Sequence, residues 1–242
     1  MIMEIIDVSK HNGLIDFNQV KKAGIEGVII RAGYGKSTTQ KDPYFEDNYR
    51  RARRAGLHVG AYWFSYTKTQ SGARDEARAC LDVIKDKVFD LPIYYDVEEK
   101  DQIKEGSSFL EGIITIFLSE LEANDKFCGL YMSRAYMEKV PLRCLVKYSL
   151  WVADWNDKCN FNLLKYGMWQ YTSKGVVAGI TGDVDRSRMY FDYPTIIKNA
   201  RLNGYNNIYD LSLLEEKISN EEDLKILYQC RDELLKLRER YL

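Results

Sequence analysis

Short apolar runs alternate with amphipathic segments from the first residues of the chain. The apolar, β-branched runs predict strands over residues 3–9, 27–35, 58–66, 91–99 and 128–133. The segments between them predict helices over residues 16–24, 44–56, 72–86 and 107–125. The last of these has the clearest helical spacing, with apolar residues at i, i+3, i+4, i+7, i+8 and i+11: Leu110, Ile113, Ile114, Phe117, Leu118 and Leu121. Alternating strand–helix units favour a parallel sheet, and five of them suggest a barrel.

The rhythm changes after residue 133. Strand patterns cover residues 149–155, 166–173 and 182–191, and only residues 134–140 offer a helix nearby. The expected fold class is therefore α/β, a TIM-like barrel of five βα units followed by three strands with little helix. A barrel of this kind carries its active site at the C-terminal strand ends. The polar and aromatic residues expected there are Asp7, Arg31, Tyr62, Asp96, Glu98, Tyr131, Asp154 and Gln170.

The last 38 residues have a different composition. Residues 205–242 hold no Gly or Pro, and their six basic and nine acidic residues give a charge of −3. Ser219 and Glu222 have the spacing of a capping box, and apolar residues recur after them every three to four positions. We therefore expect a catalytic barrel over 1–204 and a helical C-terminal extension over 205–242. This extension would dock on the barrel or on a second chain, which would make a homo-oligomer.

Composition narrows the possible partners of the 242-residue chain. Lys and Arg number 35 against 36 Asp and Glu, so no basic excess favours nucleic acid. A membrane-spanning helix needs at least about 18 consecutive apolar residues, and no run in this sequence approaches that length. Residues 1–13 lack a signal-peptide pattern. The five cysteines are odd in number and widely spaced, as expected for reduced, buried thiols. These features predict synthesis in the cytoplasm, with no membrane segment.

Two carboxylates end the fourth predicted strand. Asp96 and Glu98 are two residues apart, so in a strand they project to the same side. Like charges that close together favour one protonated group. A protonated acid beside an anion is the pair that glycoside hydrolysis requires. The alternative is a solvated strand end, since Glu99 and Asp101 follow at once.

Further acids occur at other strand ends. Asp7 follows Ile5 and Ile6, and it is either a second carboxylate of the cleft or a cap for the next loop. Asp183 and Asp185 are again two residues apart. Several acids in one cleft suit a cationic transition state, and they would also suit Ca²⁺ or Mg²⁺. No EF-hand ladder and no zinc spacing occur, so we expect no metal and no cofactor.

Aromatic residues accompany the strands. By alternation about half of them should fill the barrel, and the rest should offer flat surfaces for sugar rings. The residues in question are Tyr62, Trp63, Tyr131, Trp151, Trp155, Trp169 and Tyr171. The two histidines, His11 and His58, accompany no nucleophile motif, so a histidine-based triad is not expected.

Six ordered blocks resemble the glycoside hydrolase family 25 muramidases, the lysozyme type of phage endolysins and wall lytic enzymes. They span residues 3 to about 195: Asp7-Val8-Ser9-Lys10-His11-Asn12-Gly13 with Ile15-Asp16-Phe17, Val28–Gly35, Gly60-Ala61-Tyr62-Trp63-Phe64, Tyr95-Asp96-Val97-Glu98, Leu150-Trp151-Val152-Ala153, and Trp169-Gln170-Tyr171-Thr172 with Val184-Asp185. Two positions depart from the family pattern. Phe17 stands where Trp is frequent, and Arg186-Ser187 stands where Leu-Asn is usual.

The resemblance implies cleavage, with retention, of the β-1,4 bond between N-acetylmuramic acid and N-acetylglucosamine in peptidoglycan. It implies Glu98 as general acid/base, Asp96 as its assisting carboxylate, and Asp7 and Asp185 as two further active-site acids. The substrate-binding residues expected are Arg31, Tyr62, Tyr131, Trp151 and Gln170. The enzyme would reach the cell wall after release by a holin or another route. A non-catalytic wall-binding protein and an enzyme for another N-acetylhexosamine polymer remain alternatives.

Overall fold

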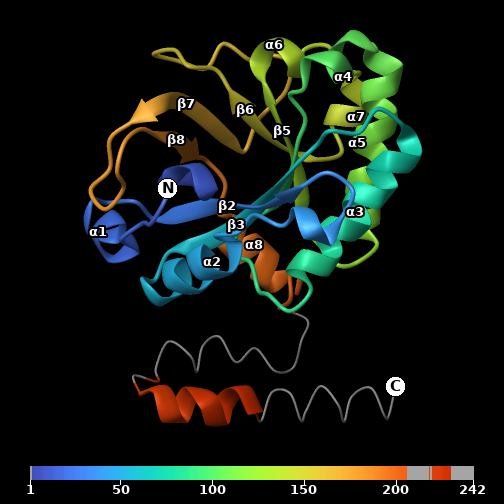
Figure 1. The fold of residues 1–242 in the computed structure, drawn as a ribbon. Helices are drawn as coiled ribbons and strands as arrows, with labels where there is room; N and C mark the ends of the chain where they lie inside the picture. Colours follow the sequence, from blue (N-terminus) through green and yellow to red (C-terminus); the bar gives the residue numbers. More distant parts are fainter. Residues whose placement is uncertain (1, 206–217, 219, 230–242) are drawn as a thin grey trace.

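Eight strands close into one barrel in the order of the chain, β1 to β8 (Figure 1). The computed structural model describes residues 2–205, 218 and 220–229. The strands are β1 (Met3–Val8), β2 (Gly27–Tyr34), β3 (His58–Phe64), β4 (Ile93–Asp96), β5 (Cys128–Ser133), β6 (Ser149–Ala153), β7 (Met168–Gly175) and β8 (Val184–Met189). The α-helices are α1 (Phe17–Lys22), α2 (Phe45–Arg54), α3 (Gln70–Ile84), α4 (Lys100–Lys104), α5 (Ser107–Glu122), α6 (Arg134–Met137), α7 (Leu142–Leu145) and α8 (Tyr193–Asn199), and η1 (Lys10–Asn12) and η2 (Thr38–Gln40) are 3₁₀ turns.

The direction of β8 sets this barrel apart from a fully parallel one. Each pair from β1–β2 to β6–β7 is parallel, whereas β8 runs antiparallel to both β7 and β1. The C-terminal ends of β1 to β7 therefore meet the start of β8 at one end of the barrel, which we call the mouth. The predicted barrel-like α/β fold is confirmed. The helices α4, α7 and α8 were not predicted.

Alternation along the strands separates two apolar layers. On β4, Tyr95 points outward and stacks on Phe117 of α5, with ring centroids 3.8 Å apart. Tyr94 points into the barrel and contacts Trp151 at 5.1 Å. Gly129 makes room for this filling, because a Cβ there would lie 2.7 Å from the Tyr94 ring. The same alternation aims Asp96, two residues after Tyr94, into the mouth.

Figure 1 shows α3 and α5 on the side of the barrel away from β7 and β8. A layer of charged and aromatic side chains lies on the outside of β7, β8 and β1. Arg188 lies 4.9 Å from the Tyr171 ring centre, and Arg186 pairs with Glu4 at 2.8 Å. Ser187 is fully buried, and it accepts a hydrogen bond from Trp151 Nε1 at 3.0 Å. Arg186 and Ser187, which stand where the family usually has Leu-Asn, therefore each have a partner: Arg186 pairs with Glu4 outside the sheet, and Ser187 bonds to Trp151 inside it.

The segment after α8 closes the base of the barrel. Asn203 is completely buried, and its side chain accepts from Phe127 N and donates to Leu91 O. Tyr205 donates its hydroxyl to Asp90 at 2.6 Å. Tyr205 is therefore held against the base of the barrel.

Part of the C-terminal extension lies within the described residues. Residues 221–229 are helical, and the Asn220 side chain accepts from Asp223 N at 2.7 Å, which caps the first turn. The cap expected at Ser219 and the remaining helix expected over 206–217 and 230–242 lie outside the described residues. In the part of the chain that the structure describes, no helix is long and apolar enough to cross a membrane.

Candidate active site

Two carboxylates face each other at the junction of β1 and β8. Asp7 and Asp185 are Cα partners in the antiparallel register of these strands. Asp7 is buried, with 8% of its surface exposed, and Asp185 is partly exposed. Since β8 starts at the mouth while β1 ends there, strands of opposite direction bring both acids to the same place.

Asp96 and Glu98 occupy the next part of the mouth. The strand β4 ends at Asp96, earlier than predicted, because the chain leaves the sheet to begin α4 at Lys100. Two backbone hydrogen bonds still fix the chain where it leaves the sheet: Ser65 N donates to Asp96 O, and Val97 N donates to Tyr131 O. Asp96 Oδ1 is buried and has no hydrogen-bond partner. An acceptor of this kind costs free energy unless a proton or a ligand satisfies it.

Burial raises the pKa values of all four carboxylates, and the charges of their neighbours raise three of them further. Burial, and then the charge of Asp185, raise the pKa of Asp7 well above its usual range. Burial followed by the charges of Glu98 and Asp7 does the same to Asp96. Burial and Asp185 raise the pKa of Glu98, and burial raises that of Asp185 to about 6. The cluster therefore retains protons at pH values where isolated carboxyls are ionised.

Gln170 connects this cluster to the aromatic wall. Its Nε2 donates to Asp7 Oδ2 at 3.0 Å, and its Oε1 accepts from both Tyr131 Oη and Trp155 Nε1 at 3.0 Å. Gln170 is only 2% exposed. Its amide oxygen already accepts two hydrogen bonds, so the residue orients Asp7, Tyr131 and Trp155 from below.

Arg31 places a positive charge close enough to Asp96 to affect its ionisation. It donates from Nε to Asp42 at 2.7 Å, and its charge lowers the pKa of Asp96 against the stronger effect of burial. A β-bulge follows Arg31 in β2, a device often found beside active sites. Asp42 also accepts from Lys10 N and Tyr44 N, so it anchors both Arg31 and the loop after β1.

The aromatic residues expected to bind substrate lie at different depths. Tyr62 is partly exposed at the mouth, and Tyr131 is 8% exposed beside Gln170. Trp151 lies deeper, 2% exposed, and contacts the Tyr131 ring at 4.5 Å. Its ring fills the barrel under the mouth, so it supports Tyr131 and is poorly placed to touch a ligand directly.

Some residues of the site gave only weak sequence signals. Asp42 follows no strand, and Glu76 lies among apolar residues of α3. Glu76 is fully buried and accepts from Ser65 Oγ, Tyr95 Oη and Tyr66 N, so it fixes the backbone next to Asp96. An acid on the apolar face of a helix was the only hint. In the described residues no group of three or more His, Cys, Asp or Glu side chains is arranged to hold a metal ion.

The chain is similar to known proteins in sequence. The protein YegX of Escherichia coli K12 is 28% identical over 185 residues, which covers 74% of this chain and 66% of YegX. The autolytic lysozyme of Clostridium acetobutylicum is 30% identical over 191 residues, covering 76% and 54% of the two chains. The chain thus spans less than two thirds of the length of these relatives.

A solved structure shares the fold. The modular autolysin LytC of Streptococcus pneumoniae, determined with a synthetic peptidoglycan ligand, superposes with a TM-score of 0.69 at 28% identity. The match covers 78% of this chain and 47% of that one. The model of the glycosyl hydrolases family 25 matches residues 6–180, which contain Asp7, Asp96 and Glu98. The chain therefore belongs to the glycosyl hydrolases family 25.

Proposed function

We propose that this protein is a peptidoglycan hydrolase, an N-acetylmuramidase of the lysozyme type. It would cleave, with retention, the β-1,4 bond between N-acetylmuramic acid and N-acetylglucosamine. The observation that carries the proposal is the group of four carboxylates gathered at the mouth: Asp7, Asp96, Glu98 and Asp185. The family match and the lysozyme and autolysin relatives support the same activity.

Glu98 acts as the general acid/base. Its raised pKa keeps a proton on the carboxyl, which is then given to the glycosidic oxygen as the bond to the sugar breaks. The resulting carboxylate later takes a proton from the attacking water, so Glu98 returns to its first state. Its position at the end of β4 and its partial exposure suit contact with a bound glycan.

Asp96 assists from a deeper position. Its unpartnered Oδ1 can accept a hydrogen bond from the acetamido N–H of the sugar, or attack the anomeric carbon as a nucleophile. Asp185, whose pKa of about 6 leaves it ionised at neutral pH, adds negative charge beside the site, which stabilises the positive charge that develops on the sugar ring. Asp7 lies opposite it in the register of β1 and β8. Arg31, Tyr62 and Tyr131 would contact the glycan, while Gln170 and Trp151 support them from below.

Zymography on bacterial walls, with the wild-type protein and Glu98→Gln, tests the activity. The wild type should clear the wall and release reducing ends, and the variant should lose about 10²–10⁴-fold in rate without any fall in melting temperature. Equal clearing by both proteins would remove Glu98 from the acid role. Wall binding without reducing ends would favour a binding protein. Product mass analysis separates peptidoglycan from other N-acetylhexosamine polymers.

The biological setting is a second part of the proposal. We infer an endolysin or a cell-wall lytic enzyme that acts on the wall after release from the cytoplasm. The segment after Tyr205 would dock on the barrel or on a second copy. Sedimentation and thermal unfolding of the full chain, beside a chain ending at Tyr205, test this. If both proteins have the same number of chains per particle and the same melting temperature, both kinds of docking are contradicted.

A further inference from the structure

Trp155, which directly follows the end of β6, is exposed at the mouth. The other three tryptophans are 0–5% exposed, whereas Trp155 is 59% exposed. Its indole N–H donates to Gln170 Oε1 at 3.0 Å. One edge of the ring is therefore fixed to the residue that holds Asp7, and its faces remain open to solvent.

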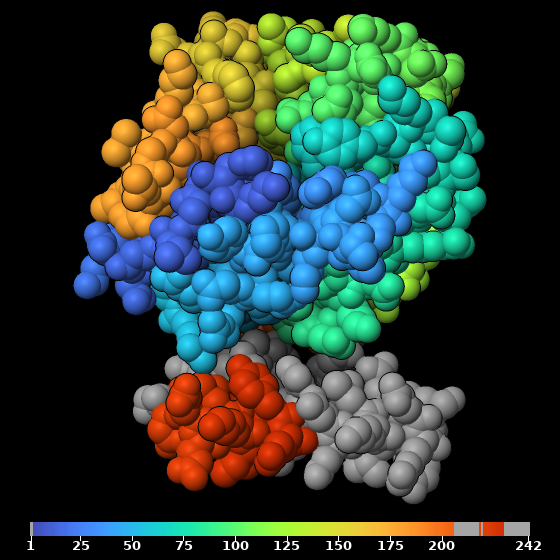
Figure 2. All heavy atoms as spheres, in the orientation of Figure 1, coloured from blue at the N-terminus to red at the C-terminus, as the bar shows by residue number. Residues whose placement is uncertain are grey.

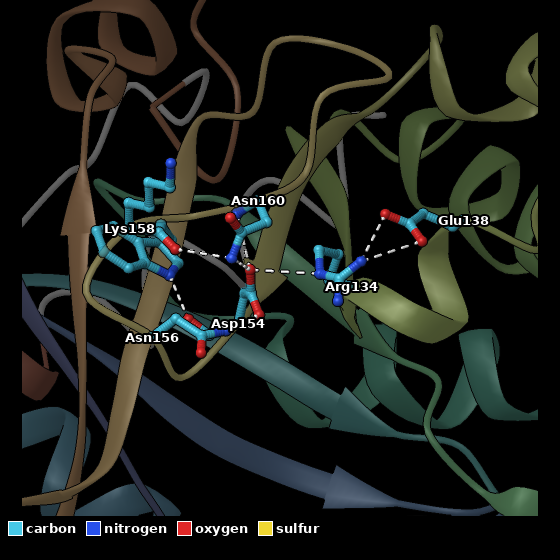
Figure 3. A network of polar contacts seen from close by, with 7 residues as sticks. Arg134, Glu138, Asp154, Asn156, Lys158 and Asn160 are labelled. Atoms are coloured by element: carbon cyan, nitrogen blue, oxygen red, sulfur yellow. Dashed lines mark hydrogen bonds and ion pairs between the residues drawn. The ribbon is translucent and has the colours of Figure 1, made fainter.

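The loop that carries Trp155 is folded around the Asp154 carboxylate (Figure 3). Asp154 accepts from Asn160 N at 2.8 Å and from Asn156 Nδ2 at 2.6 Å, and it pairs with Arg134 at 3.3 Å. Arg134, the first residue of α6, is in turn bound to Glu138 directly after that helix. These contacts immobilise the backbone on each side of Trp155, so little conformational entropy would be lost when a ligand covers the ring.

A second exposed ring lies at the end of β3. Tyr66 is 52% exposed, and it contacts Phe64 and Tyr34 with ring centroids 4.7 and 5.8 Å away. Its backbone N–H donates to the buried Glu76. The preceding residue, Ser65, donates to Asp96 O, so this ring is fixed relative to the acid cluster.

The strand order places the two rings on either side of the chemistry. β3 and β6 flank β4 and β5, which carry Asp96 and Tyr131, and Glu98 follows β4. We propose that Tyr66 and Trp155 are the two aromatic platforms of one glycan-binding track that crosses the mouth beside Glu98. The occupant is a β-1,4-linked N-acetylhexosamine chain long enough to cover both rings. This inference rests on the proposed function and adds to it the residues that hold the strand.

The chemistry of the sugar matches these surfaces. A β-linked pyranose presents a flat face of C–H groups, which packs on an aromatic ring, and its polar groups lie at the edge. Tyr and Trp offer large rigid areas with few rotatable bonds. The net charge of −1 gives little long-range attraction to an anionic wall, so contact area must supply the retention of substrate.

Fluorescence quenching tests the Trp155 platform directly. The probe is a soluble glycan strand freed of peptides by an amidase, added to the full-length Glu98→Gln variant. Acrylamide should quench Trp155 preferentially, because the other three indoles are buried, and Trp155→Phe should remove this quenching. The strand should protect the fluorescence from acrylamide. A strand that binds by calorimetry without protecting Trp155 would overturn the track and leave the hydrolase proposal intact.

Steady-state kinetics on the same strands test both platforms. Trp155→Ala and Tyr66→Ala should each raise KM roughly tenfold, the effect of about 1.4 kcal/mol of lost contact, with a smaller change in kcat. Trp155→Phe should recover part of the loss. Phe191→Ala removes a ring that is 42% exposed at the other end of the barrel and should change nothing. A KM within about twofold of wild type in either alanine variant would overturn the track; absence of reducing ends from the wild type would instead contradict the hydrolase function.

Discussion

Asp7 and Asp185 are paired across the antiparallel strands β1 and β8, so two acids from opposite ends of the barrel sequence share one side of the mouth. Figure 2 shows the N-terminal segment lying between the β7–β8 region and the α2 region. Two further bonds support this contact, from Asp16 N to Gly179 O at 2.8 Å and from Asn12 Nδ2 to Asp183 O. The closure of the barrel therefore depends on the same strands that assemble the acid cluster.

The charge of Asp185 should set the alkaline limit of activity. It raises the pKa of Glu98, so Asp185→Asn should lower that pKa and the acid should lose its proton at a lower pH. The alkaline limb of the kcat/KM profile is expected to move to lower pH in the variant. Asp183→Asn is the matched control, because Asp183 is exposed two residues away. If the alkaline limb stays in place or moves to higher pH in the Asp185 variant, the charge of Asp185 does not raise the pKa of Glu98.

The same substitution should stabilise the fold at neutral pH. Asp185 has a pKa of about 6 in the folded protein and 3.8 ordinarily, so the folded state binds its proton more tightly. Its contribution to stability is therefore lost as the pH rises from about 4 to about 6. Asp185→Asn should raise the melting temperature at pH 7 by roughly 2–4 °C and change it little at pH 4. Thermal unfolding at both pH values checks this, and an equal shift at both would refute it.

Asp90 should show the opposite dependence on pH. Its carboxylate accepts from Val59 N and Tyr205 Oη and pairs with Arg53. Burial raises its pKa, but hydrogen bonding to His58 and the charge of Arg53 outweigh burial and hold the pKa well below the usual range. This stability is present above pH 4 and lost as the pH falls towards the lowered pKa. Asp90→Asn should reduce the free energy of unfolding at pH 7 by about 3–5 kcal/mol, since the buried Arg53 loses the charge of Asp90.

Urea unfolding measures that loss. Asp101→Asn is the control, because the Asp101 side chain is 59% exposed and its ion pairs with Lys68 and Lys104 lie at the surface. The control should unfold as the wild type does. Equal midpoints for the Asp90 variant and the wild type would show that the base of the barrel does not depend on this carboxylate.

Ser187 should contribute to stability through one hydrogen bond. It is the acceptor for Trp151 Nε1 in a fully buried position, so Ser187→Ala leaves that N–H without a partner. The expected cost is about 1–3 kcal/mol. In a double-mutant cycle, Ser187→Ala should lower the free energy of unfolding less in the Trp151→Phe background than in the wild type. Additive losses would show that the two side chains are not coupled.

Much of the site could be predicted because it follows strand alternation. Asp96 lies inside the mouth since Tyr94, two residues earlier, fills the barrel. Tyr95, between them, faces α5, and the apolar spacing of residues 107–125 already indicated a helix there. Glu98 was expected in the strand but follows it, because only contacts with β5 and α4 decide where β4 ends.

Contacts between distant segments could not be predicted in this way. The local sequence around Gln170 gives no sign that its amide joins Asp7, Tyr131 and Trp155. The tryptophans illustrate the same limit, since Trp151 is buried and Trp155 is exposed although both belong to the one strand predicted over residues 149–155. Their difference arises because β6 ends at Ala153 and the chain then turns around Asp154.

The sequence by itself determined the alternation of strands and helices, the change of rhythm after residue 133, and which acids end the strands, because periodicity and strand ends are local properties. Only the tertiary structure decided the antiparallel insertion of β8, the pairing of Asp7 with Asp185, and the burial that raises their pKa values. Those features depend on barrel closure, which brings residues nearly 180 positions apart into one desolvated site, and desolvation is a property of the whole packed molecule.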